Sequence, residues 1–258
     1  MKATKVNSLN VRIYENRLQM GVAAAKDAAA QIKQLLNTQE TLNIIFAAAP
    51  SQNEFLAALL QEDVAWERIN AFHMDEYLSL PQDAPQLFGV FLKDKIFGKA
   101  PFKEIFYLNG QTNDTIAESK RYTTLLEQYP TDIVFMGIGE NTHLAFNDPH
   151  VADFNDPYLV KTVDLDDACK QQQVNDGCFD HPDRVPTHAF TLTIPALFKA
   201  KYLYCMVPGK NKAQAVYHTL TDVITEKYPS TILRTHAHAT LYLDQDSAAL
   251  IESAITVS

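Results

Sequence analysis

The chain has 258 residues, of which 47% are hydrophobic and 21% are charged, so it has ample material for a core and no compositional sign of disorder. The formal net charge of −9 argues against a nucleic-acid or anionic-membrane surface, which needs a basic patch. Three cysteines without Cys-x-x-Cys spacing suit a reducing cytosol. Because no apolar run reaches the ~18 residues of a membrane span and the N-terminus shows no signal core, we expect a soluble cytoplasmic protein with no membrane partner.

Strand-like and helix-like segments alternate along the first half of the chain. An alternating piece at Leu9–Tyr14 predicts an edge strand, and apolar positions at helical spacing predict a helix over residues 16–36. Ser51 and Glu54 fit a helix-capping box before a second helix. Further strands are expected at residues 41–49, 69–72 and 105–108, and further helices at 87–96 and 115–127.

The second half continues the alternation after a polar stretch. Residues 150–186 read as a loop. Strands are predicted at 133–136, 189–194, 200–207 and 239–244, and helices at 212–220 and from about 247 onwards. Strands that alternate with helices indicate an α/β protein, here a single Rossmann-like domain over residues 1–258 with a mostly parallel central sheet flanked by helices. The pattern neither requires nor excludes a homo-oligomer.

The strand at 133–136 runs into the most unusual polar cluster of the chain. It stops at Gly137-Ile-Gly139, where a ligand can approach the backbone closely, and Asn141, His143 and Asp148 follow. In open α/β sheets, ligands lie beyond the carboxyl ends of the strands. His143 suits a proton shuttle near neutral pH that Asp148 aims, although a packed histidine bonded to the backbone fits equally well.

A second polar group, Asp75 and Glu76, follows the strand at 69–72. Neighbouring residues on an extended backbone point in opposite directions, so only one of the two can face a cleft. A half-buried carboxylate has a raised pKa and can act as a base towards a carbon acid. The alternative is an exposed pair of loop carboxylates.

An anion site is indicated at two other places. The turn from Ala47 through Ala48 and Ala49 to Ser51 offers backbone N–H groups at a helix N-terminus, although Ser51 also fits a plain helix cap. Lys212 in the first turn of its helix works against the helix dipole, which suggests an anionic partner, although a solvated lysine fits equally well. His236 and His238 have a metal-compatible spacing without a third ligand, so we predict no metal.

Two of these stretches resemble the signature motifs of the glucosamine-6-phosphate deaminase (isomerase) family. They are residues 72–81 (Phe-His-Met-Asp-Glu-Tyr-Leu-Ser-Leu-Pro) and 137–149 (Gly-Ile-Gly-Glu-Asn-Thr-His-Leu-Ala-Phe-Asn-Asp-Pro). Val185-Pro186, residues 189–193, Val207-Pro-Gly209 and Lys212-Ala213 match the later family pattern in the same order. The likeness spans nearly the whole chain, and these motifs separate the group from the related 6-phosphogluconolactonases.

The resemblance implies an aldose–ketose isomerisation coupled to loss of ammonia, with no cofactor or metal and a phosphorylated amino sugar as substrate. In this reading His143, held by Asn141 and Asp148, moves the proton that opens the sugar ring. Asp75 takes the proton at C2 and returns it at C1. Ala47, Ala48, Ala49, Ser51, Glu76, Gly137 and Lys212 would contact the substrate.

Some positions depart from the family pattern. Asparagine stands at 141 where many members have aspartate, Asp148 replaces a usual glutamate and Thr142 a usual glycine. The segment 47–51 (Ala-Ala-Ala-Pro-Ser) replaces a threonine- and glycine-rich phosphate loop, and the arginine expected between 165 and 180 has no clear counterpart except Lys170. Two alternatives therefore stay open, a sugar-phosphate-binding protein without turnover and a 6-phosphogluconolactonase.

Overall fold

The computed structural model describes residues 1–251. Its strands are β1 (Lys2–Val6), β2 (Leu9–Tyr14), β3 (Leu42–Phe46), β4 (Ile69–His73), β5 (Asp75–Tyr77), β6 (Glu104–Phe106), β7 (Ile133–Met136), β8 (Val160–Asp164), β9 (His188–Leu192), β10 (Tyr202–Val207) and β11 (Ala239–Asp244). Its α-helices are α1 (Arg17–Leu36), α2 (Asn53–Leu59), α3 (Phe88–Leu92), α4 (Thr115–Gln128), α5 (Asp167–Asn175), α6 (Ile194–Phe198) and α7 (Ala213–Thr221).

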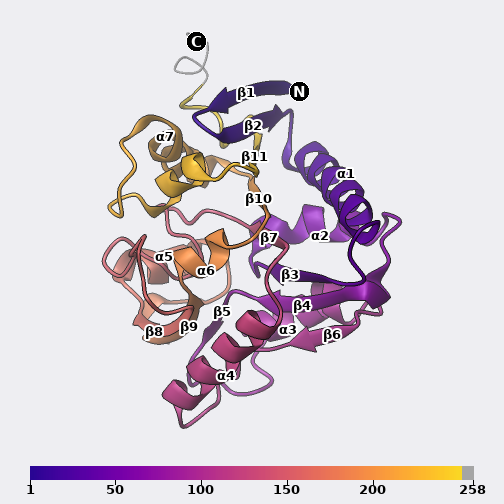
Figure 1. The fold of residues 1–258 in the computed structure, drawn as a ribbon. Helices are drawn as coiled ribbons and strands as arrows, with labels where there is room; N and C mark the ends of the chain where they lie inside the picture. Colours follow the sequence, from indigo (N-terminus) through magenta and orange to yellow (C-terminus); the bar gives the residue numbers. More distant parts are fainter. Residues whose placement is uncertain (252–258) are drawn as a thin grey trace.

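The main sheet has the strand order β1-β2-β11-β10-β7-β3-β4-β6 and lies between helices (Figure 1). Every neighbouring pair in it is parallel except β1 with β2. The prediction of a mostly parallel α/β sheet flanked by helices is therefore confirmed. From β3 the chain proceeds outwards through β4 to β6, and it then returns to β7 and proceeds the other way. The boundary between β3 and β7 is thus the point where the direction of winding reverses.

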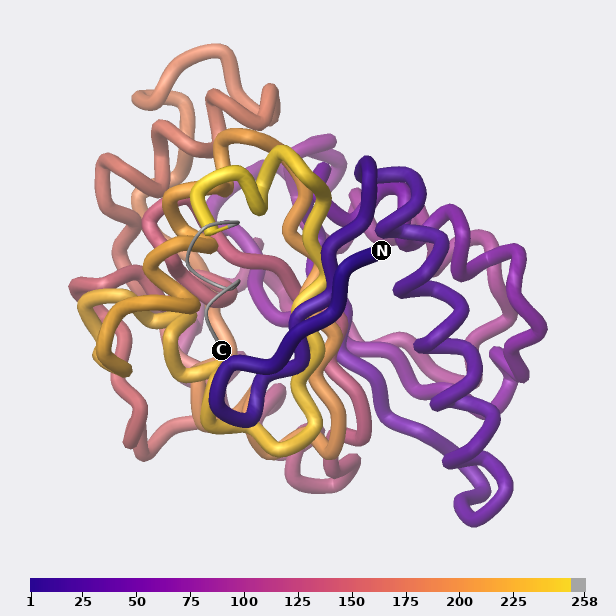
Figure 2. The backbone as a smooth tube through the Cα atoms, turned by 90° about the horizontal axis from the view of Figure 1, so that it is seen from above, coloured from indigo at the N-terminus to yellow at the C-terminus, as the bar shows by residue number. Residues whose placement is uncertain are grey.

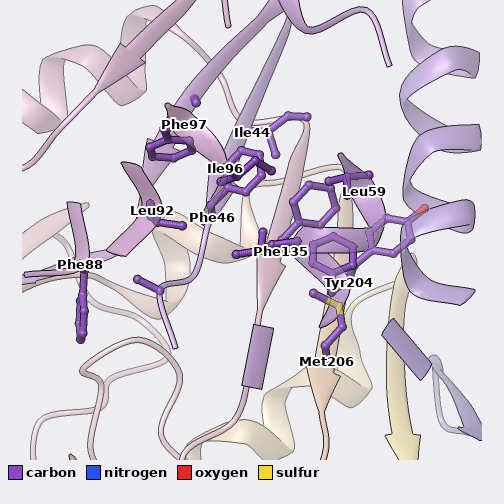
Figure 3. Packing of buried hydrophobic residues seen from close by; sticks show 14 of the residues in the cluster. Ile44, Phe46, Leu59, Phe88, Leu92, Ile96, Phe97, Phe135, Tyr204 and Met206 are labelled. Carbon is purple, nitrogen blue, oxygen red and sulfur yellow. The ribbon is translucent and has the colours of Figure 1, made fainter. Parts of the chain in front are cut away.

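The central strand β7 is buried on both faces, as a parallel strand covered by helices must be. Ile133 and Phe135 join the core on one face of the sheet, whereas Val134 and Met136 join the core on the other. On the first face, Phe135 packs edge-on against Phe46 of β3, with Tyr204 and Met206 of β10 nearby (Figure 3). This alternation fixes β7 in the middle of the molecule and brings its last residue to the carboxyl edge of the sheet.

The N-terminal strands differ from the prediction in one respect. β2 has the predicted bounds, but it is not an edge strand, because β1 pairs with it on one side and β11 on the other. Figure 2 shows the N-terminal hairpin lying alongside the yellow C-terminal part of the chain. The strongly polar β1 carries too little apolar patterning to be recognised from the sequence alone.

A second, antiparallel sheet with the order β5-β9-β8 stands apart from the main sheet, beside α5 and α6 (Figure 1). The prediction of a loop over residues 150–186 was wrong, since this stretch contains β8 and α5. α5 is a largely polar helix in which only Cys169, Gln172 and Gln173 are buried, so the sequence has no apolar periodicity that would indicate a helix here. Asp75 and Glu76 also belong to this sheet, through β5.

Two helix ends were predicted wrongly. Ser51 does not cap a helix, because the turn at Pro50–Gln52 begins at Ala49 and α2 begins without a side-chain cap. Glu54 instead receives two hydrogen bonds from Arg17, at 2.7 and 2.8 Å. Residues 247–251 form turns instead of the expected helix, whose remainder lies outside the described residues. Within residues 1–251, no helix combines the length and the apolar character that a bilayer crossing requires.

Candidate active site

A cavity of about 330 Å³ opens at the carboxyl edge of the main sheet, beside the reversal point between β3 and β7. Its walls come from the segment 47–51 after β3, from Asp75 in β5, from the loop after β7, from the C-terminal end of α5 and from Lys212. The carboxyl ends of parallel strands share one edge, and this brings together residues more than 100 positions apart. Asp75 and His143 both line this cavity, as the sequence predicted.

Asp75 is almost fully buried, with 8% of its surface exposed, and its Oδ1 atom has no hydrogen-bond partner among residues 1–251. Burial raises the pKa of Asp75 well above that of an ordinary carboxyl, and the negative charge of Glu76 adds to the rise. A carboxyl in such a place gains strength as a base and has an oxygen free to receive a proton from a ligand.

Glu76 points away from the cavity, in agreement with the alternation along β5. Its Oε1 accepts hydrogen bonds from the N–H groups of Tyr77 and Phe88, and its Oε2 accepts one from Gly89. Burial nevertheless raises the pKa of Glu76 to about 7, despite these three donors. Glu76 does not line the cavity, so the structure does not support the expected substrate contact and gives this carboxylate the role of fastening α3 to β5.

His73, which precedes Asp75 by two residues, holds the backbone at the base. The Leu108 N–H donates to its Nε2 at 3.0 Å, so the proton of the neutral ring is on Nδ1, which donates to the carbonyl of Asp75 at 2.9 Å. The ring is completely buried, and burial lowers the pKa of His73 to about 4. It therefore stays neutral at physiological pH and keeps this hydrogen-bond pattern.

His143 forms a hydrogen-bonded triangle with Asn141 and Asp148. Its Nδ1 lies 2.8 Å from Asn141 Oδ1 and 2.9 Å from Asp148 Oδ1, and Asn141 Nδ2 donates to the same aspartate oxygen at 2.8 Å. Because Nδ1 faces two acceptors, we assign the ring proton to it, which leaves the Nε2 lone pair for a ligand. The ring nitrogen contacts two side chains and not the backbone, and the ring lines the cavity, so this geometry suits the proton shuttle better than the packed histidine bonded to the backbone.

Asp148 is fully buried, at 0% exposure. Burial by itself would raise the pKa of Asp148, but the neighbouring His143 and the hydrogen bonds from His143 and Asn141 outweigh it, so the pKa is lowered. An ionised Asp148 faces Nδ1 at 2.9 Å and orients the His143 ring.

Gly139 makes room for the His143 ring. A Cβ atom added at Gly139 would lie 2.2 Å from His143 Cε1 and 2.4 Å from Nε2, far inside van der Waals contact. Thr142 adopts a left-handed backbone conformation with φ of 74°, which a β-branched side chain rarely takes. The loop after β7 is therefore shaped around the imidazole.

Asn147 anchors the same loop to the second sheet. Its side-chain amide donates to the carbonyls of Leu144 at 2.7 Å and Leu192 at 2.8 Å, and the Phe146 N–H donates to Thr191 Oγ1 at 3.0 Å. Since Thr191 pairs with Asp75 across the β5–β9 ladder, one small sheet positions both the base and the histidine loop.

The opposite end of the cavity is suited to an anion. Ala47, Ala48, Ala49 and Ser51 line it together with Gly137, as predicted, although the Ala47 N–H donates to the Phe135 carbonyl and is unavailable to a ligand. Lys212 is 5% exposed, and its Nζ makes no hydrogen bond or ion pair with any residue in the range 1–251. Burial lowers the pKa of Lys212, while Asp176 and Glu140 partly offset this effect. A buried ammonium group without a counter-ion at contact distance is a ready partner for an anionic ligand.

Several lining residues were not found from the sequence. α5 and its C-terminal end contribute Gln172, Gln173 and Asp176, and three phenylalanines form an apolar wall: Phe88, Phe91 and Phe146. Lys170, the substitute considered for the missing arginine, is not among the lining residues. Only the polar character of the glutamine run could have indicated this part of the site, because α5 was not recognised as a helix.

Potential metal ligands are otherwise engaged. One atom each of His143, Asp148 and Cys169 lies within 4.8 Å of the others, but the histidine nitrogen of this group already bonds Asp148 and Asn141. Burial strongly raises the pKa of Cys169, so its thiol is protonated. His236 bonds the Ala200 carbonyl through Nε2 and accepts the His238 N–H through Nδ1, which leaves neither nitrogen for a metal.

The fold and cavity define an α/β protein with a small-molecule-sized cavity, lined by a buried lysine, where the sheet reverses its winding. Residues 15–242 match the model of one family, glucosamine-6-phosphate isomerases/6-phosphogluconolactonase. The chain belongs to this family.

Relatives of known name agree with this placement. The glucosamine-6-phosphate deaminase of Listeria innocua is 32% identical over 237 residues, covering 92% of this chain and 97% of the relative. That of Bacillus cereus is 31% identical over 224 residues, covering 87% and 84%. A solved monomeric glucosamine-6-phosphate deaminase superposes with a TM-score of 0.85 at 27% identity, over 93% of this chain and 99% of the other. The 6-phosphogluconolactonase of Thermotoga maritima, with a TM-score of 0.75 at 17% identity, covers 92% of this chain and 99% of its own; it shares the fold alone.

Proposed function

We propose that this protein is an amino-sugar-phosphate deaminase that isomerises glucosamine 6-phosphate to fructose 6-phosphate and releases ammonia. The observation that carries the proposal is the joint presence of Asp75, His143 and Lys212 around one cavity of about 330 Å³. This volume is of the size that small-molecule sites have. A carboxylate base, an oriented imidazole and a buried cation are the groups that this reaction needs.

Ring opening is the first step. His143 takes the proton of the C1 hydroxyl on Nε2 and delivers a proton to the ring oxygen, so that the C1–O5 bond breaks and an open-chain aldehyde forms. Asp148 and Asn141 hold the ring from the Nδ1 side, at 2.9 and 2.8 Å, and the buried Asp148 charge stabilises the protonated imidazole. His143 can both accept and donate the proton through Nε2, because its ring is fixed and need not rotate between the two transfers.

Isomerisation follows at Asp75. Its free Oδ1 takes the C2 proton, and the C–H electron pair forms the double bond between C1 and C2. The electron pair displaced from the C1 carbonyl moves to the aldehyde oxygen, which takes a proton from the ammonium group of the substrate. Asp75 then returns a proton to C1, which leaves an imine at C2. Water adds to this imine and ammonia departs, giving the ketone of fructose 6-phosphate. The raised pKa of Asp75 brings its basicity closer to that of the carbon acid, so proton transfer in both directions is facilitated.

The phosphate group is held at the other end of the cavity by Lys212 and the Ser51 hydroxyl, beside the turn at Ala48 and Ala49. Binding the non-reacting end of the substrate positions C1 and C2 between the histidine and the aspartate.

Ammonia release from glucosamine 6-phosphate by the purified protein tests the proposal. Asp75→Asn should abolish release, because an amide cannot accept the C2 proton, while hexose 6-phosphate binding is retained. Asp63→Asn, on the surface, is the matched control and should behave as wild type. A protein that binds the sugar phosphate without ammonia release from any amino-sugar phosphate would contradict the proposal and favour the binding-protein alternative. Lactone hydrolysis that survives Asp75→Asn would favour the lactonase.

The cellular setting follows from the same proposal. A phosphorylated amino sugar is an intracellular metabolite, so we expect the protein in the cytoplasm, with no nucleic-acid or membrane partner. A homo-oligomer stays a prediction, which light scattering on the purified protein tests.

A further inference from the structure

The anion end of the cavity contains a negative charge that a phosphate site does not need. Asp176, the residue that follows α5, lines the cavity together with Lys212. A chain of hydrogen bonds ties it to the lysine segment: Gln172 Nε2 donates to Asp176, the Glu140 N–H donates to Gln172, and Asn211 donates to Glu140, at 3.3, 2.7 and 2.7 Å. Asp176 and Lys212 therefore line the same end of the cavity.

Two carboxylates lie near Lys212, and only one of them lines the cavity. Glu140 accepts amide hydrogen bonds from Asn211 at 2.7 Å and Asn175 at 3.1 Å, and it does not line the cavity. Asp176 accepts a single long bond from Gln172 and does line it. Among residues 1–251, the aspartate, glutamate, lysine and arginine side chains on the cavity wall are those of Asp75, Asp176 and Lys212, so one lysine and two carboxyl groups line it.

We propose that Asp176 determines the charge state of the substrate, so that this site binds the phosphate ester best as a monoanion. This inference rests on the proposed function. A phosphate monoester loses its second proton near pH 6. The monoanion retains one P–O–H group, which donates to the Asp176 carboxylate while the other oxygens accept from Lys212 and Ser51. The dianion has no proton to donate, and its extra charge is repelled by Asp176.

The two thiols near this end of the cavity do not change their charge over the relevant pH range. The titratable groups around Lys212 are the carboxylates of Asp176 and Glu140 and the thiol of Cys169. Asp176, Cys178, Asp75 and His143 line the cavity together with Lys212. Burial raises the pKa of Cys178 to about 11 and raises that of Cys169 further, so both thiols stay neutral below pH 8. A sugar phosphate without an amine is used as ligand, so that the phosphate is the group of the ligand that titrates in this pH range.

Calorimetric binding of two ligands to the wild-type protein separates the charge state from other effects of pH. Fructose 6-phosphate titrates near pH 6, whereas glucose 6-sulfate is a monoanion throughout. We expect the Kd of the phosphate ester to weaken about tenfold between pH 5.5 and 8, one unit of pKa difference being a factor of ten, and the Kd of the sulfate ester to stay constant. A phosphate Kd that tightens with rising pH would overturn the inference.

Asp176→Asn provides the second arm. It should tighten fructose 6-phosphate binding about tenfold at pH 8 and lower the KM for glucosamine 6-phosphate by the same factor, with kcat within twofold. Asp183→Asn, whose side chain is 91% exposed, is the control and should leave all values unchanged. Unchanged KM and Kd in Asp176→Asn would refute the assignment. If the protein releases ammonia but its Kd for fructose 6-phosphate has the wrong pH dependence, only this inference is overturned. If neither ester binds, the proposed function is overturned as well.

Discussion

Gly139→Ala is the most direct test of how the histidine loop works. The added Cβ would lie 2.2 Å from His143 Cε1, whereas an ordinary contact of this kind begins at 3.4 Å, so the ring must move by about 1 Å. Such a shift breaks the Nδ1 hydrogen bonds of 2.8 and 2.9 Å to Asn141 and Asp148. A misplacement of this size costs about 100-fold in rate, or about 2.7 kcal/mol of transition-state stabilisation.

The assay is ammonia release from glucosamine 6-phosphate, measured as kcat/KM for four proteins. Gly139→Ala should lose about 100-fold in the wild-type background. In a His143→Ala background the ring that collides with the new methyl group is gone, so the same substitution should cost little further activity. A Gly139→Ala variant with wild-type kcat/KM, or equal losses in both backgrounds, would show that the ring position does not govern the reaction.

Three further outcomes are expected. Lys212→Met should raise the KM for glucosamine 6-phosphate at least tenfold, because a hydrogen bond to a charged group contributes about 1.5–3 kcal/mol, while thermal denaturation shows no loss of stability. Burial raises the pKa of Glu76 to about 7, so the folded state binds this proton more tightly than the unfolded state does. The free energy of unfolding should therefore fall by roughly 3 kcal/mol as pH rises from about 4.5 to about 7. Denaturant titrations at several pH values should show this decline, and Glu76→Gln should flatten it. Thr142→Gly should raise the free energy of unfolding by about 1 kcal/mol, since glycine accepts the φ of 74° without strain; a lower melting temperature would argue against that strain.

Much of the fold was predictable from local patterns. β2 and β11 have the predicted bounds, because alternating or branched apolar runs determine strand formation wherever a face is buried. The helix over α1 follows from its apolar spacing and from Asn16, whose side chain caps it. β1 and α5 were missed because each is mostly polar, so long-range contacts, not periodicity, hold them in place.

The sequence by itself indicated which side chains could do chemistry here. The glycine, amide, imidazole and carboxylate groups after β7 are recognisable as a candidate site by their type and spacing. It also required that only one of Asp75 and Glu76 face a cleft. Only the tertiary structure decided which one, because β9 pairs with β5 in a register that no local signal specifies. The placement of Asp176 opposite Lys212 was likewise settled by the packing of α5 over the sheet edge. Contacts between residues so far apart depend on the order of the strands, which arises only when the whole core assembles.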